Sequence, residues 1–438
     1  MNTQYRQLNG QDYKTLSLSA LGGALEFYDF IVYAFFASMI SELFFPPNMP
    51  EWLKLLQTFG IFAAGYLSRP FGGIIMAHFG DLVGRKRMFT LSILLMAIPT
   101  FAIGLLPTYA SIGVFAPILL LLMRVMQGAA IGGEIPGAWV FVSEHVPANR
   151  MGLACGVLTS GLTLGILIGS LVYMLLNSVM TQDALREYGW RIPFLLGGVF
   201  GFLTMYLRRW LKETPIFIEM QERKKLAQDL PLKSVLMEHR EAVFVSMLLT
   251  WILSAGILVV IIMAPFYLTE SLGLPSMDVS IANSIAIVAL AIGCIFYGAL
   301  IERLGVSRTF ILGSVFACIS VFIFYYSANH SPEMIIWTYP LAGFGVGFIG
   351  SFAYVMVRAF PAVVRFTGVS LAFNMAYAIT AAFTTPLVLT LTQFVNIMSP
   401  AYYVITLFVM GIGLGVYLRR QHYASQSHVM EELAIPTK

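Results

Sequence analysis

Charged residues are scarce in this chain of 438 residues, where Asp, Glu, Lys and Arg together make up 11%. A typical soluble protein carries about 25%. Hydrophobic residues reach 58%, and the mean hydropathy is +0.81. A chain this poor in charge is typical of a protein that crosses the lipid bilayer several times. The net charge of +4 is too small to indicate a nucleic-acid partner.

Cysteine, nucleotide-binding motifs and catalytic sets are also rare or missing. Cys155, Cys294 and Cys318 each stand alone in an apolar run, which indicates neither a disulfide framework nor a metal site. The sequence contains no G-x-x-x-x-G-K-[ST] loop with which ATP could drive the protein. It contains no recognisable nucleophile–base set either. We therefore expect no cofactor, no metal and no enzymatic activity.

The first apolar run differs from a cleaved signal peptide, because it is long and carries acidic residues. We interpret it as the first membrane span, since a spanning helix needs about 20 apolar residues. Twelve spans are predicted, in two sets of six: 18–45, 53–78, 88–106, 112–142, 152–179 and 192–210, then 242–268, 279–301, 309–327, 334–357, 368–395 and 402–418.

The charges of the loops alternate along the chain. One set of loops is basic and includes Arg6, Lys14, Arg85, Lys86, Arg87, Arg150, the central loop, Arg303, Arg308, Arg365, Arg419 and Arg420. The other set is acidic and includes Glu42, Glu51, Asp183, Glu187, Asp278 and Glu333. The positive-inside rule predicts that both termini and the central loop lie in the cytoplasm. We expect a multi-pass protein of a bacterial-type cytoplasmic membrane.

The two sets of spans resemble each other in sequence. GDLVGRKRMF at 80–89 aligns with IERLGVSRTF at 301–310, and Arg150 aligns with Arg365. We expect two pseudo-symmetric six-helix bundles with a site between them at mid-membrane, an arrangement found in secondary transporters. The predicted divisions are an N-terminal bundle at 1–210, a cytoplasmic central loop at 211–240, a C-terminal bundle at 241–420 and a cytoplasmic tail at 421–438.

The stretch RVMQGAAIGGEIPGAWVFVSEHVPANR, at 124–150, combines a spanning helix with the buried charges Arg124 and Glu134. A charge in mid-membrane costs roughly 2.5 to 3.5 kcal/mol on insertion scales, so this helix should line a polar pathway. Pro136 is expected to kink it.

Three carboxylates and one guanidinium group are predicted to lie in the cytoplasmic half of the N-terminal bundle, with a second guanidinium group near the midplane. Glu26 and Asp29 share a face of the first span, because they are three residues apart. With Glu134, Arg69 and Arg124 they leave about one carboxylate without a full partner, and such a group can exchange a proton near neutral pH. Asp29 is our leading candidate for proton coupling, followed by Glu26 and Glu134. The alternative is a structural salt-bridge network.

Arg124 is the leading candidate for binding an anionic group of a substrate, because its guanidinium offers a carboxylate two parallel hydrogen bonds. Its alternative role is a fixed partner for a carboxylate of the first span. The further substrate-binding candidates are Gln127, Arg69, Tyr33, Asn374 and Tyr377.

Several of these motifs resemble the major facilitator superfamily, and within it the metabolite:proton symporter family of oxoglutarate, citrate, shikimate and proline/betaine carriers. The likeness rests on GDLVGRKR and RVMQG together with GALEFYDF, RPFGG, GGE, GWRIPF, ETP and VRFTGVSLAFN. It covers nearly the whole chain and implies the major facilitator fold. The second loop motif, IERLGVSR, departs from the pattern, which predicts weaker gating contacts in that half.

The resemblance assigns the first loop motif to gating. It implies that Asp81, Gly84, Arg85 and Arg87 latch the cytoplasmic face shut, with Asp81 near a helix end or an arginine of the opposite rim. Their charges are expected to be solvated.

The sequence predicts a proton-coupled symporter that imports a small polar metabolite by alternating access and acts as a monomer. An organic acid such as a di- or tricarboxylate is the leading substrate class, because it suits Arg124. A zwitterionic osmolyte such as proline or betaine is the alternative. A drug/proton exporter of the same fold is less favoured, since the fifth span, SGLTLGILIGS, lacks the proline of the exporter motif. A nutrient receptor or a membrane enzyme is the remaining alternative.

Overall fold

Every described element of this computed structural model is helical, and the structure describes residues 6–222 and 231–433. The first bundle is built from α1 (Gly10–Phe35), α2 (Ala37–Phe44), α3 (Glu51–Val83), α4 (Arg85–Leu105), α5 (Tyr109–Ile112), α6 (Phe115–His145), α7 (Met151–Val179), α8 (Gln182–Ala184) and α9 (Arg191–Arg208). The second is built from α12 (Arg240–Ile257), α13 (Ala264–Phe266), α14 (Ser276–Leu304), α15 (Val306–His330), α16 (Ile335–Val346), α17 (Phe352–Arg358), α18 (Arg365–Phe394) and α19 (Ser399–Leu433).

These helices confirm the predicted twelve-span fold. Among the described residues, ten helical segments are long and apolar enough to cross a membrane, and α8 to α9 form an eleventh that is bent by 43°. The twelfth is α3, whose 33 residues extend about 50 Å at 1.5 Å per residue, against a bilayer core of about 30 Å.

The ends of the spans differ from the predicted ends where local hydrogen bonds extend a helix. α1 begins at Gly10, because Asn9 and Asp12 form a capping box that satisfies its first backbone N–H groups. The segment between the bundles contains two short helices, α10 (Pro215–Glu222) and α11 (Pro231–Glu238). Its basic residues Arg223, Lys224 and Lys225 lie outside the described part. In the predicted tail, α19 continues to Leu433.

The seventh span changes its helical geometry twice. After α12 come π-helical turns at Leu258–Met263 and Tyr267–Ser271, separated by α13. A π-helical turn leaves some backbone carbonyls without their usual intrahelical partner. The Tyr325 hydroxyl donates to the carbonyl of Val259 at 3.0 Å, and the Tyr339 hydroxyl donates to that of Val260 at 2.8 Å. The span is therefore held in this geometry by the neighbouring helices.

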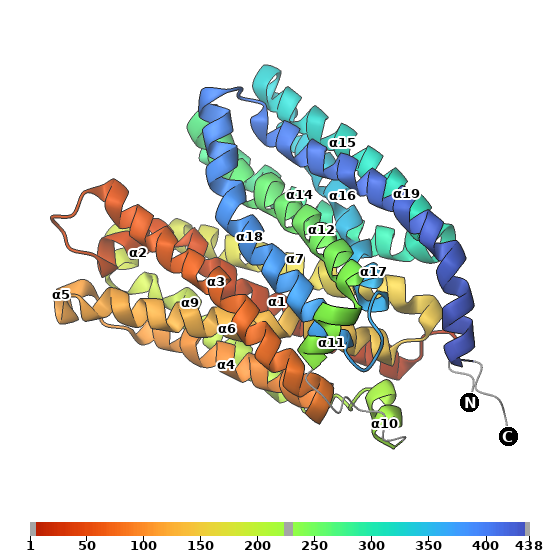
Figure 1. Ribbon diagram of the computed structural model, residues 1–438. Helices are drawn as coiled ribbons and strands as arrows, with labels where there is room; N and C mark the ends of the chain where they lie inside the picture. The colour runs from red at the N-terminus through yellow and green to blue at the C-terminus, as the bar shows by residue number, and fades with distance from the viewer. Residues whose placement is uncertain (1–5, 223–230, 434–438) are drawn as a thin grey trace.

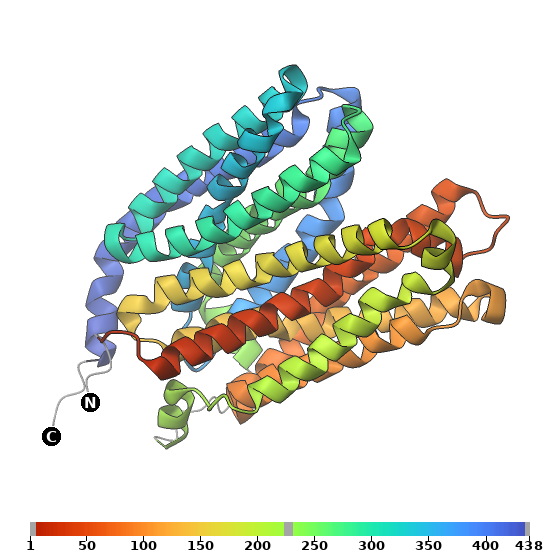
Figure 2. The ribbon, with the colours of Figure 1, turned by 180° about the vertical axis from the view of Figure 1, so that it is seen from behind.

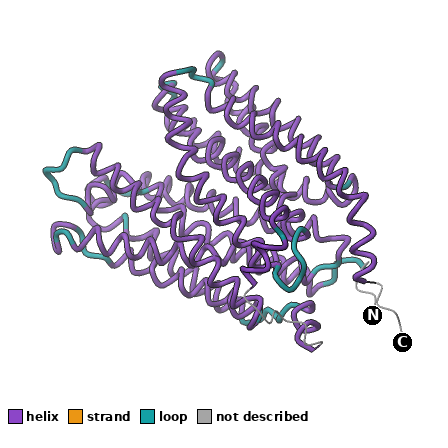
Figure 3. Tube along the Cα trace, in the orientation of Figure 1, coloured by secondary structure: helices purple, strands orange, loops and turns teal. Residues whose placement is uncertain are grey.

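The two bundles meet at one end of the molecule and diverge towards the other (Figures 1 and 2). We call the end at which α10 and α11 lie the linker end, and the opposite one the far end (Figure 1). The loops are short and gather at these two ends (Figure 3). α3 packs against α18 and α7 packs against α14. Glycine permits the second contact, because a Cβ atom on Gly156 would lie 2.5 Å from the carbonyl oxygen of Cys294.

Candidate functional site

Asp81 of the first loop motif caps a helix of the opposite bundle. Its Oδ2 accepts hydrogen bonds from the backbone N–H and the hydroxyl of Thr367, both at 2.9 Å. Thr367 lies in the first turn of α18, where the helix dipole favours a negative charge. Arg85 is 3.3 Å from the second carboxylate oxygen of Asp81 and donates to the carbonyl of Ala362 at 2.6 Å. This part of the motif therefore joins the bundles at the linker end.

Glu144, which the sequence analysis missed, connects the arginines of this network. Its carboxylate lies 3.4 Å from Arg85 and 3.1 Å from Arg365, and it accepts the hydroxyl of Thr214 at 2.7 Å. The expectation that the motif charges are solvated is wrong for Asp81 and Arg85, which are at most 1% exposed. They are buried because they lie where the bundles meet, with Thr367 and Ala362 contributed by the opposite bundle.

Two further motif residues behave differently. Arg87 is exposed, as expected for a charge that faces solvent. Gly84 has a φ of 128°, which only glycine adopts readily, and it separates α3 from α4. The carboxylate of Glu213 caps α4 by accepting the N–H of Lys86 at 3.1 and 3.2 Å. Glu213 belongs to the ETP motif, to which the sequence analysis assigned no structural role.

The second loop motif makes a contact equivalent to that of Asp81. Glu302 occupies the position aligned with Asp81, and it accepts the N–H of Leu153 at 2.7 Å in the first turn of α7. Arg150 donates to the same carboxylate at 3.3 Å. The prediction of weaker contacts in this half did not include this cap.

Arg124 lies fully buried inside the first bundle among aromatic rings. Its guanidinium carbon lies 4.4 Å from the ring centre of Tyr33 and 5.1 Å from that of Phe62. It donates to Gln127 at 2.9 Å, and Gln127 donates to the hydroxyl of Thr100 at 2.6 Å. The predicted group of Arg124, Gln127 and Tyr33 is therefore brought together, with the guanidinium stacked on rings.

A second guanidinium–aromatic group crosses between the bundles. The guanidinium carbon of Arg69 lies 4.7 Å from the ring centre of Tyr66 and 4.6 Å from that of Tyr377. The two rings stack with their centres 5.6 Å apart. Tyr377 is on α18, so α3 and α18 share this group. Further ring contacts extend the series at both ends and make one aromatic chain through Tyr33, Phe62, Tyr66, Tyr377, Phe373 and Trp139.

Asp29 faces away from both arginine groups. Its carboxylate is 1% exposed and packs against Gly197 and Gly201 of α9, beside Met96 of α4. Oδ1 makes no hydrogen bond within the described residues. The predicted grouping of Asp29 with Arg69 and Glu134 is therefore not formed. The side chain of Glu26 lies outside the described part.

Glu134 has a partner that the sequence analysis missed. It forms a buried ion pair with Arg208 of α9 and accepts a hydrogen bond from Ser92. Arg208 also donates to the carbonyl of Phe89 at 2.6 Å, and its guanidinium stacks on the ring of Phe89. Because Arg208 ends a span, its charge resembled a topology signal. The pair joins α6, α9 and α4.

Asn374, predicted to bind substrate, bridges the two bundles in this structure. Its Nδ2 donates to the carbonyl of Gly132 at 2.6 Å and to that of Ser370 at 2.8 Å. Both acceptors are carbonyls, so the orientation of the amide is fixed by its partners.

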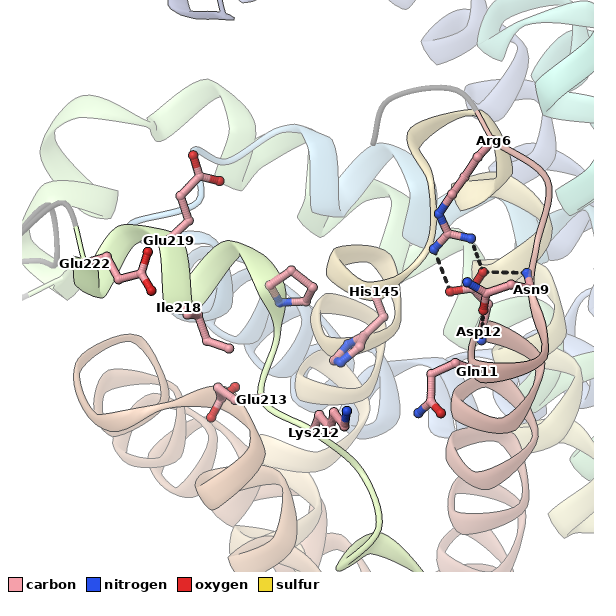
Figure 4. Close-up of a pocket in the computed structure, with 11 residues that line it drawn as sticks. Arg6, Asn9, Gln11, Asp12, His145, Lys212, Glu213, Ile218, Glu219 and Glu222 are labelled. Atoms are coloured by element: carbon pink, nitrogen blue, oxygen red, sulfur yellow. Dashed lines mark hydrogen bonds and ion pairs between the residues drawn. The ribbon is translucent and has the colours of Figure 1, made fainter. Parts of the chain in front are cut away.

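The linker end also carries a pocket of about 480 Å³, lined mainly by polar side chains of the N-terminal segment, the end of α6 and the α10 region (Figure 4). The labelled residues are Arg6, Asn9, Gln11, Asp12, His145, Lys212, Glu213, Ile218, Glu219 and Glu222. Its charges have both signs, and Arg6 is paired with Asp12. It lies apart from the predicted substrate residues.

Known proteins resemble this chain over most of its length. The profile of the Major Facilitator Superfamily matches residues 20–385. The glycine betaine/proline/ectoine/pipecolic acid transporter OusA of Dickeya dadantii is 30% identical over 94% of this chain and 84% of its own length. The proline/betaine transporter of Salmonella typhimurium is 31% identical over the same shares. The proton:xylose symporter XylE has a similar fold, with a TM-score of 0.76 at 17% identity over 93% of this chain and 95% of its own.

Proposed function

This chain belongs to the major facilitator superfamily, and we propose that it imports a zwitterionic osmolyte of the proline and betaine type together with protons. It is a multi-pass membrane transporter rather than an enzyme. The observation that carries the proposal is the pairing of two buried guanidinium groups, Arg124 and Arg69, with the aromatic chain.

A zwitterion needs a site with two chemistries, and the aromatic chain supplies both. A guanidinium group binds a carboxylate through parallel hydrogen bonds. The faces of Tyr66, Tyr377 and Phe62 attract a quaternary or secondary ammonium by the cation–π interaction. The substrate ammonium would replace one guanidinium group over an aromatic ring. The substrate carboxylate would then bind the displaced guanidinium group.

The organic acid favoured by Arg124 alone is the weaker proposal. A di- or tricarboxylate would bring two or three negative charges to rings whose faces repel anions. The names of the relatives from Dickeya dadantii and Salmonella typhimurium support the zwitterion as well.

Proton coupling is proposed for Asp29. Glu134 is already neutralised by Arg208, whereas Asp29 is buried among glycines with one oxygen that accepts no hydrogen bond within the described residues. A buried carboxylate of this kind is a candidate for loading and releasing a proton during transport. The electrical part of the driving force would be about 2.3 kcal/mol per charge per 100 mV.

We further propose that the linker end faces the cytoplasm, following the basic loops that lie there. The capped and ion-paired linker end would then correspond to a closed inner face, with the bundles diverging towards the outside. Opening would break the contacts of Asp81 and Glu302 and expose the site inward.

Uptake by the purified protein in proteoliposomes tests the substrate class. With an imposed proton gradient, radiolabelled glycine betaine and proline should accumulate above their external concentrations, and a protonophore should abolish this accumulation. Succinate and citrate should neither accumulate nor compete. Protein-free liposomes serve as the control for leakage. Accumulation of citrate or succinate without accumulation of either zwitterion would reject the proposal in favour of an organic acid.

A further inference from the structure

Pro136 lies inside α6, where a proline removes one backbone hydrogen bond. A helical N–H normally donates to the carbonyl four residues earlier, and proline has no N–H. The carbonyl left without this donor is that of Gly132. The expected kink is not a break, because α6 runs continuously from Phe115 to His145.

The opposite bundle uses this carbonyl. Asn374 of α18 donates to the Gly132 oxygen at 2.6 Å, and the Ser370 hydroxyl donates to it at 3.3 Å. Both side chains are fully buried. A carbonyl has two lone pairs, so these two donors satisfy the acceptor that the proline leaves open.

α3 leaves room for this contact at Gly73. A Cβ atom at this position would lie 2.8 Å from both the Gly132 oxygen and the Ser370 hydroxyl oxygen. Three helices from the two bundles therefore meet at a single backbone carbonyl. Asn374 lies one helical turn from Tyr377, so the contact also adjoins the ring that stacks on Tyr66.

A second proline of the same bundle provides a comparison. Pro99 lies inside α4 and leaves the carbonyl of Leu95 without its usual donor. No side chain among the described residues donates to that carbonyl. A proline inside a helix of this bundle is therefore not enough to recruit a partner, and the bond at Gly132 depends on the donor placed opposite.

We propose that Pro136 is a positioning residue for the transport cycle: it exposes the Gly132 carbonyl as an acceptor for Asn374 and thereby stabilises the state in which the linker end is closed. The contact must break when the bundles separate at that end. The proposal rests on the proposed transport function for its role in a cycle, but the conformational effect can be measured without transport.

The test uses the full chain in detergent, without substrate or gradient, and measures distances between spin labels at Val83 and Arg303. These exposed positions lie at the linker ends of α3 and α14, one in each bundle. In Pro136→Ala the new N–H competes for the Gly132 carbonyl, and Asn374→Leu removes the donor. Each variant should raise the ratio of open to closed distances by about 2- to 10-fold, the range expected for one hydrogen bond.

The double variant separates this role from a purely structural one. If Pro136 acts through Asn374, then Pro136→Ala should change the ratio by less than about twofold in the Asn374→Leu background. Pro99→Ala is the matched control and should leave the ratio unchanged. Circular dichroism and size-exclusion chromatography verify that each variant folds. If the leucine side chain prevents folding, Asn374→Ala replaces Asn374→Leu.

Two results would overturn the proposal: an unchanged distance distribution in Pro136→Ala, or equal effects of Pro136→Ala with and without Asn374. Neither result depends on which substrate is carried. Failure of the uptake experiment would in turn leave the distance measurement intact, so the two proposals fail independently.

Discussion

Asp81 and Thr367 join opposite bundles through two hydrogen bonds to a single carboxylate oxygen, each 2.9 Å long. Thr367 lies in the first turn of α18, so the carboxylate also meets the positive end of that helix. Glu302 and Leu153 repeat the relationship with the roles of the bundles exchanged. The linker end is therefore held by two reciprocal caps.

Replacing Asp81 with Asn should slow transport while leaving the amount of protein in the membrane unchanged. The substitution removes the charge that interacts with the α18 dipole, which is worth about 1 kcal/mol or a fivefold change in the closed population. Initial uptake rates in vesicles, normalised to protein by immunoblot, measure the effect. The control is Asp183→Asn, an exposed carboxylate in the short helix α8. Wild-type turnover in Asp81→Asn would exclude the gating role.

Replacing Arg124 with Lys should weaken substrate binding by about tenfold or more, because lysine offers neither the planar fork nor the same stacking surface. Apparent affinity from the concentration dependence of uptake, or from isothermal titration, measures the change. Retained wild-type affinity would show that Arg124 does not bind the substrate carboxylate.

The ring of Tyr377 should matter more than its hydroxyl group. We expect Tyr377→Phe to keep most of the affinity for glycine betaine, since the ring face is retained. Tyr377→Leu should lose about 1 kcal/mol or more of binding free energy, because the cation–π contact is removed. Competition assays against radiolabelled betaine compare the two variants. Equal losses in both would point to the hydroxyl instead.

Replacing Asp29 with Asn should abolish uphill uptake but spare exchange of substrate across the membrane. The amide cannot take up and release a proton, whereas exchange needs no net proton movement. Proteoliposomes loaded with unlabelled substrate report exchange, and an imposed pH gradient reports accumulation. Glu42→Gln, an exposed carboxylate paired with Arg186, is the matched control. Normal accumulation by Asp29→Asn would remove Asp29 from the coupling role.

Replacing Glu134 with Gln should destabilise the first bundle. The change leaves the buried guanidinium of Arg208 without its ion-pair partner. Removing one partner of a buried pair lowers the free energy of unfolding by about 3–5 kcal/mol. A lower thermal unfolding midpoint in detergent checks this. The double variant Glu134→Gln with Arg208→Gln should recover part of the loss, because no uncompensated charge remains. An unchanged midpoint in the single variant would mean that the pair contributes little to stability.

The sequence predicted those features of the fold that depend directly on the bilayer. The number of spans, the two bundles and the positions of the loops could be predicted from the lengths of the apolar runs and from the loop charges. This works because a charged group inside the bilayer costs free energy. The positions of Arg124, Gln127 and Tyr33 beside one another could also be anticipated, since they lie on helices whose direction is known.

The partners of the buried charged residues could not be predicted in the same way. Whether Glu134 meets Arg69 or Arg208 depends on the rotation of α6 about its axis, which weak periodicity in an apolar span does not determine. The alignment of the two loop motifs already placed Glu302 opposite Asp81, but it could not show which helix start the Glu302 carboxylate would cap. The π-helical turns of the seventh span depend on tyrosines of two other helices, Tyr325 and Tyr339.

The reciprocal caps have a consequence for how the chain can be recombined. Each cap has its carboxylate in one bundle and its helix in the other, so neither half contains a complete closure of its own. A chimera that takes one bundle from a relative would mix carboxylates and helix starts of different ancestry at both positions. Functional chimeras should therefore exchange the loop motif of one half together with the helix start that it caps in the other.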